Sequence, residues 1–230
     1  MLTLGEELIL VALDTDKGVI RGSQTMQFGL NAAGLADLLA GELITLRQPN
    51  GSSGVTLVAD ADRRHIDDPL LAAVRKQVQS MREGDRHPDR CVRNWLEPSL
   101  HVYLKALRNR GVVDWDKPTQ PKVRYGRFRL LDTEPAVAAR ARVDRVTAGA
   151  EPDVRDLDLA GIVHGLGLDK AVYGGMRGRL KRAALAGAVD KQRFAVILTR
   201  ALPMKPGLDF TINAPNNLAE VWAMDGSPGA

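Results

Sequence analysis

The chain has 230 residues, of which 44% are hydrophobic, and it carries a formal net charge of +4. A chain of this length can bury a complete hydrophobic core without the help of disulfides or metals. The longest apolar run, residues 8–13, is far shorter than the roughly 20 residues that a membrane-spanning helix needs. Any contact with a membrane is therefore expected to be peripheral.

The cysteine content and the first residues predict a cytoplasmic protein. The single cysteine, Cys91, cannot form a disulfide within the chain. The start of the sequence lacks the basic region and cleavage site that are typical of a secretory signal. We expect Cys91 itself to be a partly buried apolar residue, which is the usual behaviour of an isolated cysteine.

The positive charge is concentrated in one stretch. Residues 117–145 contain eight basic and three acidic side chains, a balance of +5, so the rest of the chain sums to −1. Such focusing is typical of a surface that docks on phosphate or anionic lipid, although a solvated charged face would give the same pattern.

Two helices are predicted at the N-terminal end. Thr3 and Glu6 have the spacing of a capping box, in which each side chain satisfies a backbone amide at a helix start. The residues that follow are apolar on all sides, so this helix should be buried and central, and Asp14 and Gly18 should end it. Ser23 is the expected cap of a second helix.

Signals for a hairpin and two helices come next. Short apolar runs at 43–46 and 55–58 flank a loop rich in glycine and serine, which predicts a small β-hairpin. Asp68 and Pro69 are typical of an N-cap and a first helical residue, so a helix should begin there. A further helix should end at Gly111 in a left-handed conformation.

A second, longer hairpin is predicted from residues 112–115 and 123–131, and it carries much of the basic charge. Thr133 should cap the helix that follows, and Gly149 should end it. The expected apolar residues of this helix are Val137, Ala141 and Val146.

The remainder of the chain predicts three more helices, near 152–164, 176–186 and 191–202. From residue 203 the pattern dissolves into proline, glycine and asparagine, which is typical of a loosely attached or disordered tail. We therefore expect one mainly α domain over residues 1–202 with one or two β-hairpins, and a tail over 203–230.

No motif for catalysis or metal binding is present. The four histidines and the cysteine lack the spacing of metal ligands, and no nucleophile-elbow sequence occurs. Gly165 and Gly167 do not follow a strand, so they are not expected to form a dinucleotide loop. We expect no catalytic residue, no metal, no cofactor and no enzymatic activity.

Arginines near the second hairpin are the candidate site. Arg142 and Arg145 are three residues apart, so they should share a helix face and could bind one phosphate together. Arg140 should point toward the rim of such a site, and Arg21 precedes a helix N-terminus, where anions are favoured. Exposed helix arginines without a ligand would show the same spacing.

Several sequence motifs follow one another in a fixed order along residues 1–190. They are Leu-Thr-Leu-Gly-Glu-Glu-Leu at 2–8, Ile-Arg-Gly-Ser at 20–23, Leu-Ala-Asp-Leu-Leu-Ala-Gly at 35–41, Asp-Pro-Leu-Leu at 68–71 and Glu-Pro-Asp at 151–153. As an ordered set they resemble the Golgi phosphoprotein 3 family, in particular its bacterial, actinomycete-type members.

The resemblance implies a central helical bundle wrapped by amphipathic helices, with a protruding hairpin used in self-association. Eukaryotic members are peripheral membrane proteins that recognise phosphatidylinositol 4-phosphate and act as adaptors for glycosyltransferases. The resemblance assigns lipid phosphate binding to Arg140, Arg142 and Arg145, and it implies a tryptophan and an arginine within 21–31. This chain has no aromatic residue from 19 to 27 and has Asn31 where that arginine is expected.

The sequence thus favours a cytoplasmic protein that attaches peripherally to membranes by binding anionic phospholipid or phosphoinositide head groups, and an adaptor role is a further hypothesis. A second copy of the chain, bound through the hairpin at 112–131, is the other expected partner. The alternative is a helical nucleic-acid-binding protein that uses the basic hairpin. Because no base-reading motif supports that alternative, nucleic acid is not expected as a partner.

Overall fold

A computed structural model of the chain describes residues 1–22, 25–47, 56–59, 66–82, 85–94, 100–116 and 126–202. These residues form ten helices and three two-stranded antiparallel sheets. The structure is therefore mainly α-helical, which confirms the predicted fold class. Residues 117–125, which include the predicted loop of the second hairpin and the first residues of its predicted second strand, lie outside the described residues, as does the predicted tail at 203–230.

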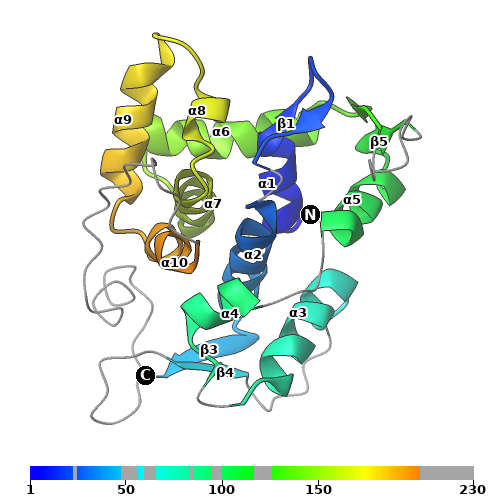
Figure 1. Cartoon of the computed structure of the whole chain (residues 1–230), viewed down its shortest axis with the longest axis vertical. Helices are drawn as coiled ribbons and strands as arrows, with labels where there is room; N and C mark the ends of the chain where they lie inside the picture. Colours follow the sequence, from blue (N-terminus) through cyan, green and yellow to red (C-terminus); the bar gives the residue numbers. More distant parts are fainter. Residues whose placement is uncertain are drawn as a thin grey trace.

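Figure 1 shows the elements in their order along the chain. The helices are α1 (Leu4–Ala12), α2 (Met26–Ala40), α3 (Pro69–Ser80), α4 (Pro88–Asn94), α5 (Leu100–Asn109), α6 (Glu134–Ala148), α7 (Val154–Gly165), α8 (Asp169–Val172), α9 (Gly178–Val189) and α10 (Arg193–Ala201). The strands are β1 (Leu13–Asp14), β2 (Val19–Ile20), β3 (Ile44–Arg47), β4 (Thr56–Ala59), β5 (Val113–Trp115) and β6 (Phe128–Leu130).

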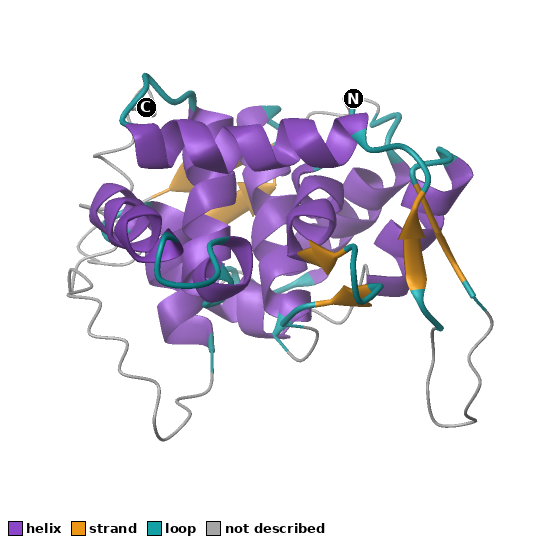
Figure 2. Cartoon of the chain, turned by 90° about the horizontal axis from the view of Figure 1, so that it is seen from above, coloured by secondary structure: helices purple, strands orange, loops and turns teal. Residues whose placement is uncertain are grey.

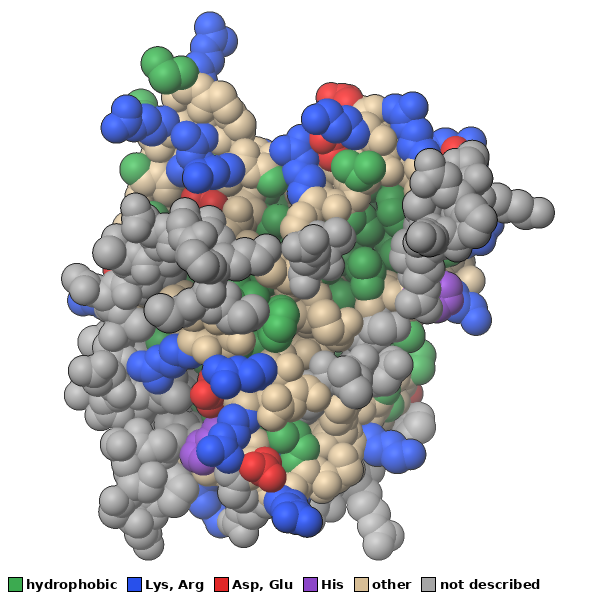
Figure 3. All heavy atoms as spheres, viewed as in Figure 1, with side chains coloured by type: hydrophobic (Ala, Val, Ile, Leu, Met, Phe, Trp, Pro, Cys, Tyr) green, Lys and Arg blue, Asp and Glu red, His purple; other side chains and the backbone are tan. Residues whose placement is uncertain are grey.

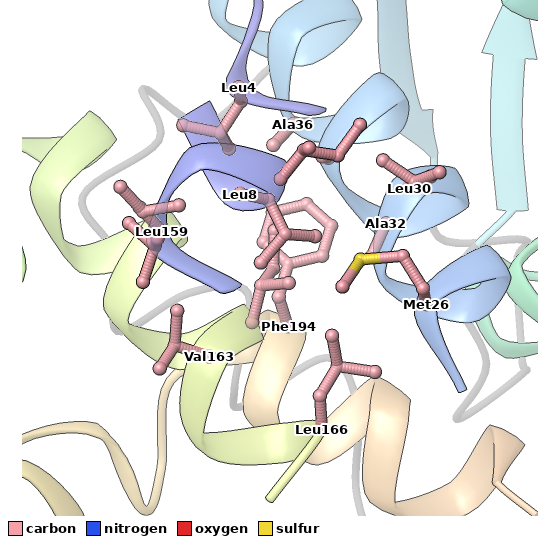
Figure 4. Packing of buried hydrophobic residues seen from close by; sticks show 14 of the residues in the cluster. Leu4, Leu8, Met26, Leu30, Ala32, Ala36, Leu159, Val163, Leu166 and Phe194 are labelled. Atoms are coloured by element: carbon pink, nitrogen blue, oxygen red, sulfur yellow. The ribbon is translucent and has the colours of Figure 1, made fainter. Parts of the chain in front are cut away.

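Helix α1 lies at the centre of the molecule, as the apolar run at 8–13 predicts. All of its residues are buried, and it packs against α2, α5, α6, α7 and α8. Figure 4 shows Leu8 of α1 among side chains from α2, α7 and α10, including Leu30, Val163 and Phe194. Burial of each such side chain contributes about 1.5–3 kcal/mol, so this cluster is the main source of stability.

The small sheets lie around the helices, and the β5–β6 hairpin stands at one edge of the molecule (Figure 2). Both predicted strand pairs are present. Those of the first hairpin have the expected length, shifted by one residue, and those of the second are shorter than expected. The β1–β2 hairpin was not predicted, because Asp14 and Gly18 were interpreted only as the end of a helix. Instead Asp14 pairs with Val19, and Gly18 turns the chain with a left-handed φ of 64°.

Several predicted helix ends are confirmed. The backbone N–H of Glu6 donates to the Thr3 hydroxyl at 3.3 Å, and the Glu6 carboxylate accepts from the Thr3 N–H at 2.8 Å. Asp68 accepts hydrogen bonds at the start of α3, and Gly111 and Gly149 adopt left-handed conformations.

Other helix ends differ from the prediction. The Thr133 side chain does not cap α6, because Asp132 takes that role by accepting from the Glu134 N–H at 3.0 Å. Ser23 lies outside the described residues, and Thr25 occupies the position before the first residue of α2.

The predicted apolar side of α6 is confirmed at Val146, which is buried, and is wrong at Val137. Its buried residues are Ala139, Val143 and Val146, whereas Val137 is 66% exposed. The buried residues are spaced four and three apart, which is the spacing of one helix face, and this face packs toward α1 and α7. Val137 therefore points to solvent.

A buried carboxylate connects the first two helices. Asp37 of α2 accepts from the backbone N–H of Leu4 at 2.7 Å and from Arg155 Nη1 of α7 at 2.7 Å. Burial raises the pKa of Asp37 to about 6, because the loss of hydration outweighs the stabilising effect of Arg155 and of the Leu4 amide.

This raised pKa predicts a pH-dependent stability. Between the ordinary value of 3.8 and about 6, the folded state holds a proton on Asp37 that the unfolded state has lost. The contribution of Asp37 to the free energy of unfolding therefore falls as pH rises through this window, and it is constant above it. Relative to the wild type, an Asp37→Asn variant should gain about 1–3 kcal/mol across the window.

Urea denaturation of both proteins at a series of pH values measures this difference. An Asp16→Asn variant at an exposed carboxylate is the matched control and should show no such gain. A constant difference between Asp37→Asn and the wild type would contradict the assignment.

Candidate functional site

The structure divides the four candidate arginines into two pairs. Arg142 and Arg145 both bond to Asp156 of α7, whereas Arg21 and Arg140 both reach the carboxyl end of α8. The four side chains thus serve two separate groups of partners.

Arg142 and Arg145 bond to one carboxylate, as expected if the two arginines share a helix face. Arg142 Nη1 lies 2.8 Å from Asp156 Oδ1, and Arg145 forms two parallel bonds to the same carboxylate at 2.8 and 2.7 Å. The Asp156 side chain is only 2% exposed. The chelating geometry that the sequence suggested for a phosphate is therefore occupied by a carboxylate of the protein.

Asp156 is held in its charged form. Burial alone would raise its pKa, but the hydrogen bonds from Arg145 and Arg142 outweigh this effect and lower the pKa below the usual range. Asp156 also forms a capping box with Asp153 at the start of α7. The two arginines thus neutralise a carboxylate that fixes the beginning of a helix.

The second pair belongs to a basic group that we call the α8-end cluster, which consists of Arg21, Arg140, Tyr173, Lys181 and Arg182. Arg21 Nη1 donates to the Ala171 carbonyl at 3.1 Å, and Arg140 donates to the Val172 carbonyl. Arg182 donates to the carbonyls of Tyr173 and Gly175. Carbonyls at the end of a helix carry a partial negative charge, which favours cations at this place.

Two of these cations form cation–π contacts with the Tyr173 ring. The Arg140 guanidinium lies 5.0 Å from the ring centroid, and Lys181 Nζ lies 5.2 Å from it. The Tyr173 hydroxyl donates to Asp144 at 2.9 Å, and Lys181 is paired with the same carboxylate. Cation–π contacts of this kind contribute about 0.5–1 kcal/mol at exposed sites, so they orient the side chains more than they neutralise them.

The α8-end cluster keeps an excess of positive charge. Its four cations face two carboxylates, Asp14, which pairs with Arg21 at 2.6 Å, and Asp144. The side chains of Arg21 and Lys181 are substantially exposed. Figure 3 shows basic side chains along the upper edge of the molecule, where Figure 1 places β1, α8 and α9. An anion approaching this edge can reach the outer atoms of the cluster.

Lys181, Arg182 and Tyr173 were missed as site residues by sequence reasoning. Lys181 and Arg182 lie in the segment 176–186 that was interpreted only as a helix, and Tyr173 precedes it. A signal was present, because residues 170–189 contain five basic and no acidic side chains.

Asn31, which stands where the resemblance implies an arginine, is a structural residue. It is buried, it accepts from Gln27 Nε2 at 2.9 Å, and it donates to the Val92 carbonyl at 2.9 Å. Its amide therefore connects α2 to α4 and offers no donor to a surface ligand.

Other kinds of site find little support in the part of the chain that the structure describes. Those residues contain no group of three or more His, Cys, Asp or Glu side chains that could hold a metal ion. Among the same residues, no helix has the length and apolar character needed to cross a bilayer. Cys91 is fully buried, and burial raises the pKa of its thiol to about 12, which makes it a poor nucleophile.

The fold and the site define a mainly α-helical domain with an arginine-rich basic edge. The chain belongs to the Golgi phosphoprotein 3 (GPP34) family, whose family model matches residues 4–202. This match confirms the resemblance of the ordered sequence motifs. No curated protein sequence gives a match to the chain.

The Arg142–Arg145–Asp156 contacts predict a large effect on stability. An Arg142→Ala, Arg145→Ala double variant would leave the Asp156 carboxylate buried without a cationic partner, so the free energy of unfolding should fall by about 3–5 kcal/mol. Urea denaturation measures this loss. In an Asp156→Asn background the same double substitution should cost much less, because no buried charge remains. Equal losses in both backgrounds would show that the ion pairs are not responsible.

Proposed function

We propose that the protein is a peripheral membrane protein that binds anionic lipid head groups through the α8-end cluster. The convergence of Arg21, Arg140, Lys181 and Arg182 at one edge is the observation that carries the proposal. Membership of the Golgi phosphoprotein 3 family is consistent with a lipid-binding role. We extend the proposal to an adaptor function, in which the membrane-bound domain holds a second protein.

The charges of the cluster set the expected strength of this binding. A basic residue beside an anionic bilayer contributes about 1 kcal/mol, so four residues give at most about 4 kcal/mol. Pairing with Asp14 and Asp144 lowers this figure. Binding should therefore be weak at physiological ionic strength and should decrease steeply with added salt.

We also propose low selectivity among head groups. Arginine forks suit phosphate monoesters, but Asn31 is turned inward and residues 19–27 contain no aromatic side chain. Phosphatidylinositol phosphates, phosphatidylinositol and cardiolipin should therefore compete for the protein.

Vesicle co-sedimentation tests the lipid proposal. An Arg21→Gln, Arg140→Gln double variant removes two charges from the cluster and should bind anionic vesicles at low salt more than about tenfold more weakly than the wild type. Arg140→Lys keeps the charge and should retain most of the binding. A Lys76→Gln, Lys105→Gln variant removes two exposed charges from α3 and α5 and is the matched control. Arg75, the neighbour of Lys76, is buried and would be an unsuitable control.

Three outcomes would count against the proposal. If the cluster variant and the control lost vesicle binding equally, binding would depend on the overall charge of the protein and not on the cluster. No binding of the wild type to any anionic vesicle at low salt would remove the lipid proposal. Binding to duplex DNA in the absence of vesicle binding would favour the nucleic-acid alternative.

We propose further that two copies associate through β5. Among the described residues, β5 pairs only with β6, so its other edge has no strand partner there and could pair with a strand of a second chain. The outer side of β6 is approached instead by the β1–β2 turn, since the Phe128 N–H donates to the Gly18 carbonyl at 2.9 Å. Light scattering at micromolar concentration should detect a dimer or larger species, and deletion of residues 117–122 should weaken it. A monomer in both proteins would refute this proposal.

A further inference from the structure

Helix α9 exposes an apolar stripe on its outer side. Met176 in the preceding turn is 89% exposed and Leu180 is 80% exposed. Ala183, Ala184 and Gly187 continue the same face, because they lie three, four and seven residues after Leu180 and are also exposed. The inner face of α9 is anchored by Leu185 and Val189, which are fully buried, and the helix packs on α6 and α7.

Basic side chains border this stripe. Arg177 and Lys181 are four residues apart and lie along one side of it, and Arg179 lies on the other side. Arg177 and Arg179 are exposed, and among the described residues neither side chain forms an ion pair or a hydrogen bond. Residues 170–189 contain no acidic residue. In Figure 3 apolar and basic side chains occur together at the upper left, where Figure 1 shows α9 and the turn before it.

The backbone before α9 holds the stripe outward. Gly175 has a left-handed φ of 68°, and Gly178 is pressed against the Tyr173 carbonyl so closely that a Cβ atom would collide with it. The first turn of α9 is thereby fixed to the α8-end cluster. A head group at the cluster and the stripe on α9 can therefore meet the same membrane surface.

We propose that α9 lies in the interface of an anionic bilayer, with Met176 and Leu180 inserted beneath the head groups. The proposal rests on the lipid-binding function proposed above and adds a second, apolar contribution to it. An apolar stripe flanked by Lys and Arg is the pattern of helices that lie in the plane of a membrane. The long basic side chains can keep their charges among the phosphates while the apolar ones are buried.

The charge and shape of this face favour a bilayer over other partners. A second copy docking through the same face would bring Arg177 and Arg179 toward their own equivalents without a compensating carboxylate on α9. A nucleic acid would satisfy the arginines but would leave Met176 and Leu180 against a charged backbone. An anionic bilayer provides partners for both kinds of side chain.

Partitioning of the full chain into vesicles of phosphatidylcholine with phosphatidylglycerol tests the insertion. A Met176→Ser, Leu180→Ser variant should bind at least about tenfold more weakly, since burial of a large apolar side chain corresponds to roughly that factor or more. A Val137→Ser, Val154→Ser variant removes two exposed apolar side chains from α6 and α7 and should bind as the wild type does. An Arg177→Gln, Arg179→Gln variant should lose about fivefold for each charge removed.

A fluorescent probe reports insertion directly. Leu180→Cys can be labelled with an environment-sensitive dye, because the one native cysteine, Cys91, is fully buried and resists modification. Emission from this label should shift to the blue when phosphatidylglycerol vesicles are added and should not shift with pure phosphatidylcholine. The same dye on Lys76→Cys of α3 should not respond.

The outcomes separate the two proposals. Insertion would be refuted if the wild type and the Met176→Ser, Leu180→Ser variant bound anionic vesicles equally well and the label at position 180 stayed in water. Head-group binding would then remain supported. Failure of the wild type to bind any anionic vesicle would refute both. If the Met176→Ser, Leu180→Ser variant lost a dimer that the wild type forms and bound vesicles unchanged, the stripe would be a contact between two copies of the chain. That result would also refute insertion.

Discussion

A buried network of arginines and carboxylates determines how the central helices meet. Arg142 of α6 lies 2.8 Å from Asp156 of α7 and 3.5 Å from Glu7 of α1, and Arg155 of α7 reaches Glu7 and Asp37. Four helices are thus joined by ion pairs whose carboxylates are almost completely buried. Because each buried carboxylate is costly without its partner, this network favours a placement of α1, α2, α6 and α7 in which every carboxylate keeps its arginine.

The network also determines which charges remain for other roles. Arginines that are neighbours in sequence bind different partners. Arg142 and Arg145 neutralise Asp156, whereas Arg140 donates to a carbonyl at the end of α8. Among the described residues, an excess of positive charge therefore remains around α8 and α9, where Arg140 of the basic stretch meets Arg21, Lys181 and Arg182. A sum of charges along the chain measures composition, but contacts decide which of those charges face solvent.

Local signals made much of the fold predictable, and distant contacts explain what was not. Helix starts at Thr3 and Asp68 and the helix stop at Gly149 depend on neighbouring residues, so the sequence indicates them directly. The partner of Arg142 and Arg145 lies on the next helix, and the inward turn of Asn31 depends on α4, so local patterns could not show either contact. Strands as short as β1 and β2 leave no periodicity to detect.

The inner and outer sides of α9 are under different constraints, because only the inner side packs on the core. Leu185 and Val189 on the inner side are fully buried, whereas Leu180, Ala183, Ala184 and Gly187 on the outer side are exposed. Substitutions on the outer side can therefore accumulate without loss of folding. Members of the family that share the same interior are free to differ in the surface that this helix presents, and similarity of their cores is a poor guide to what that surface binds.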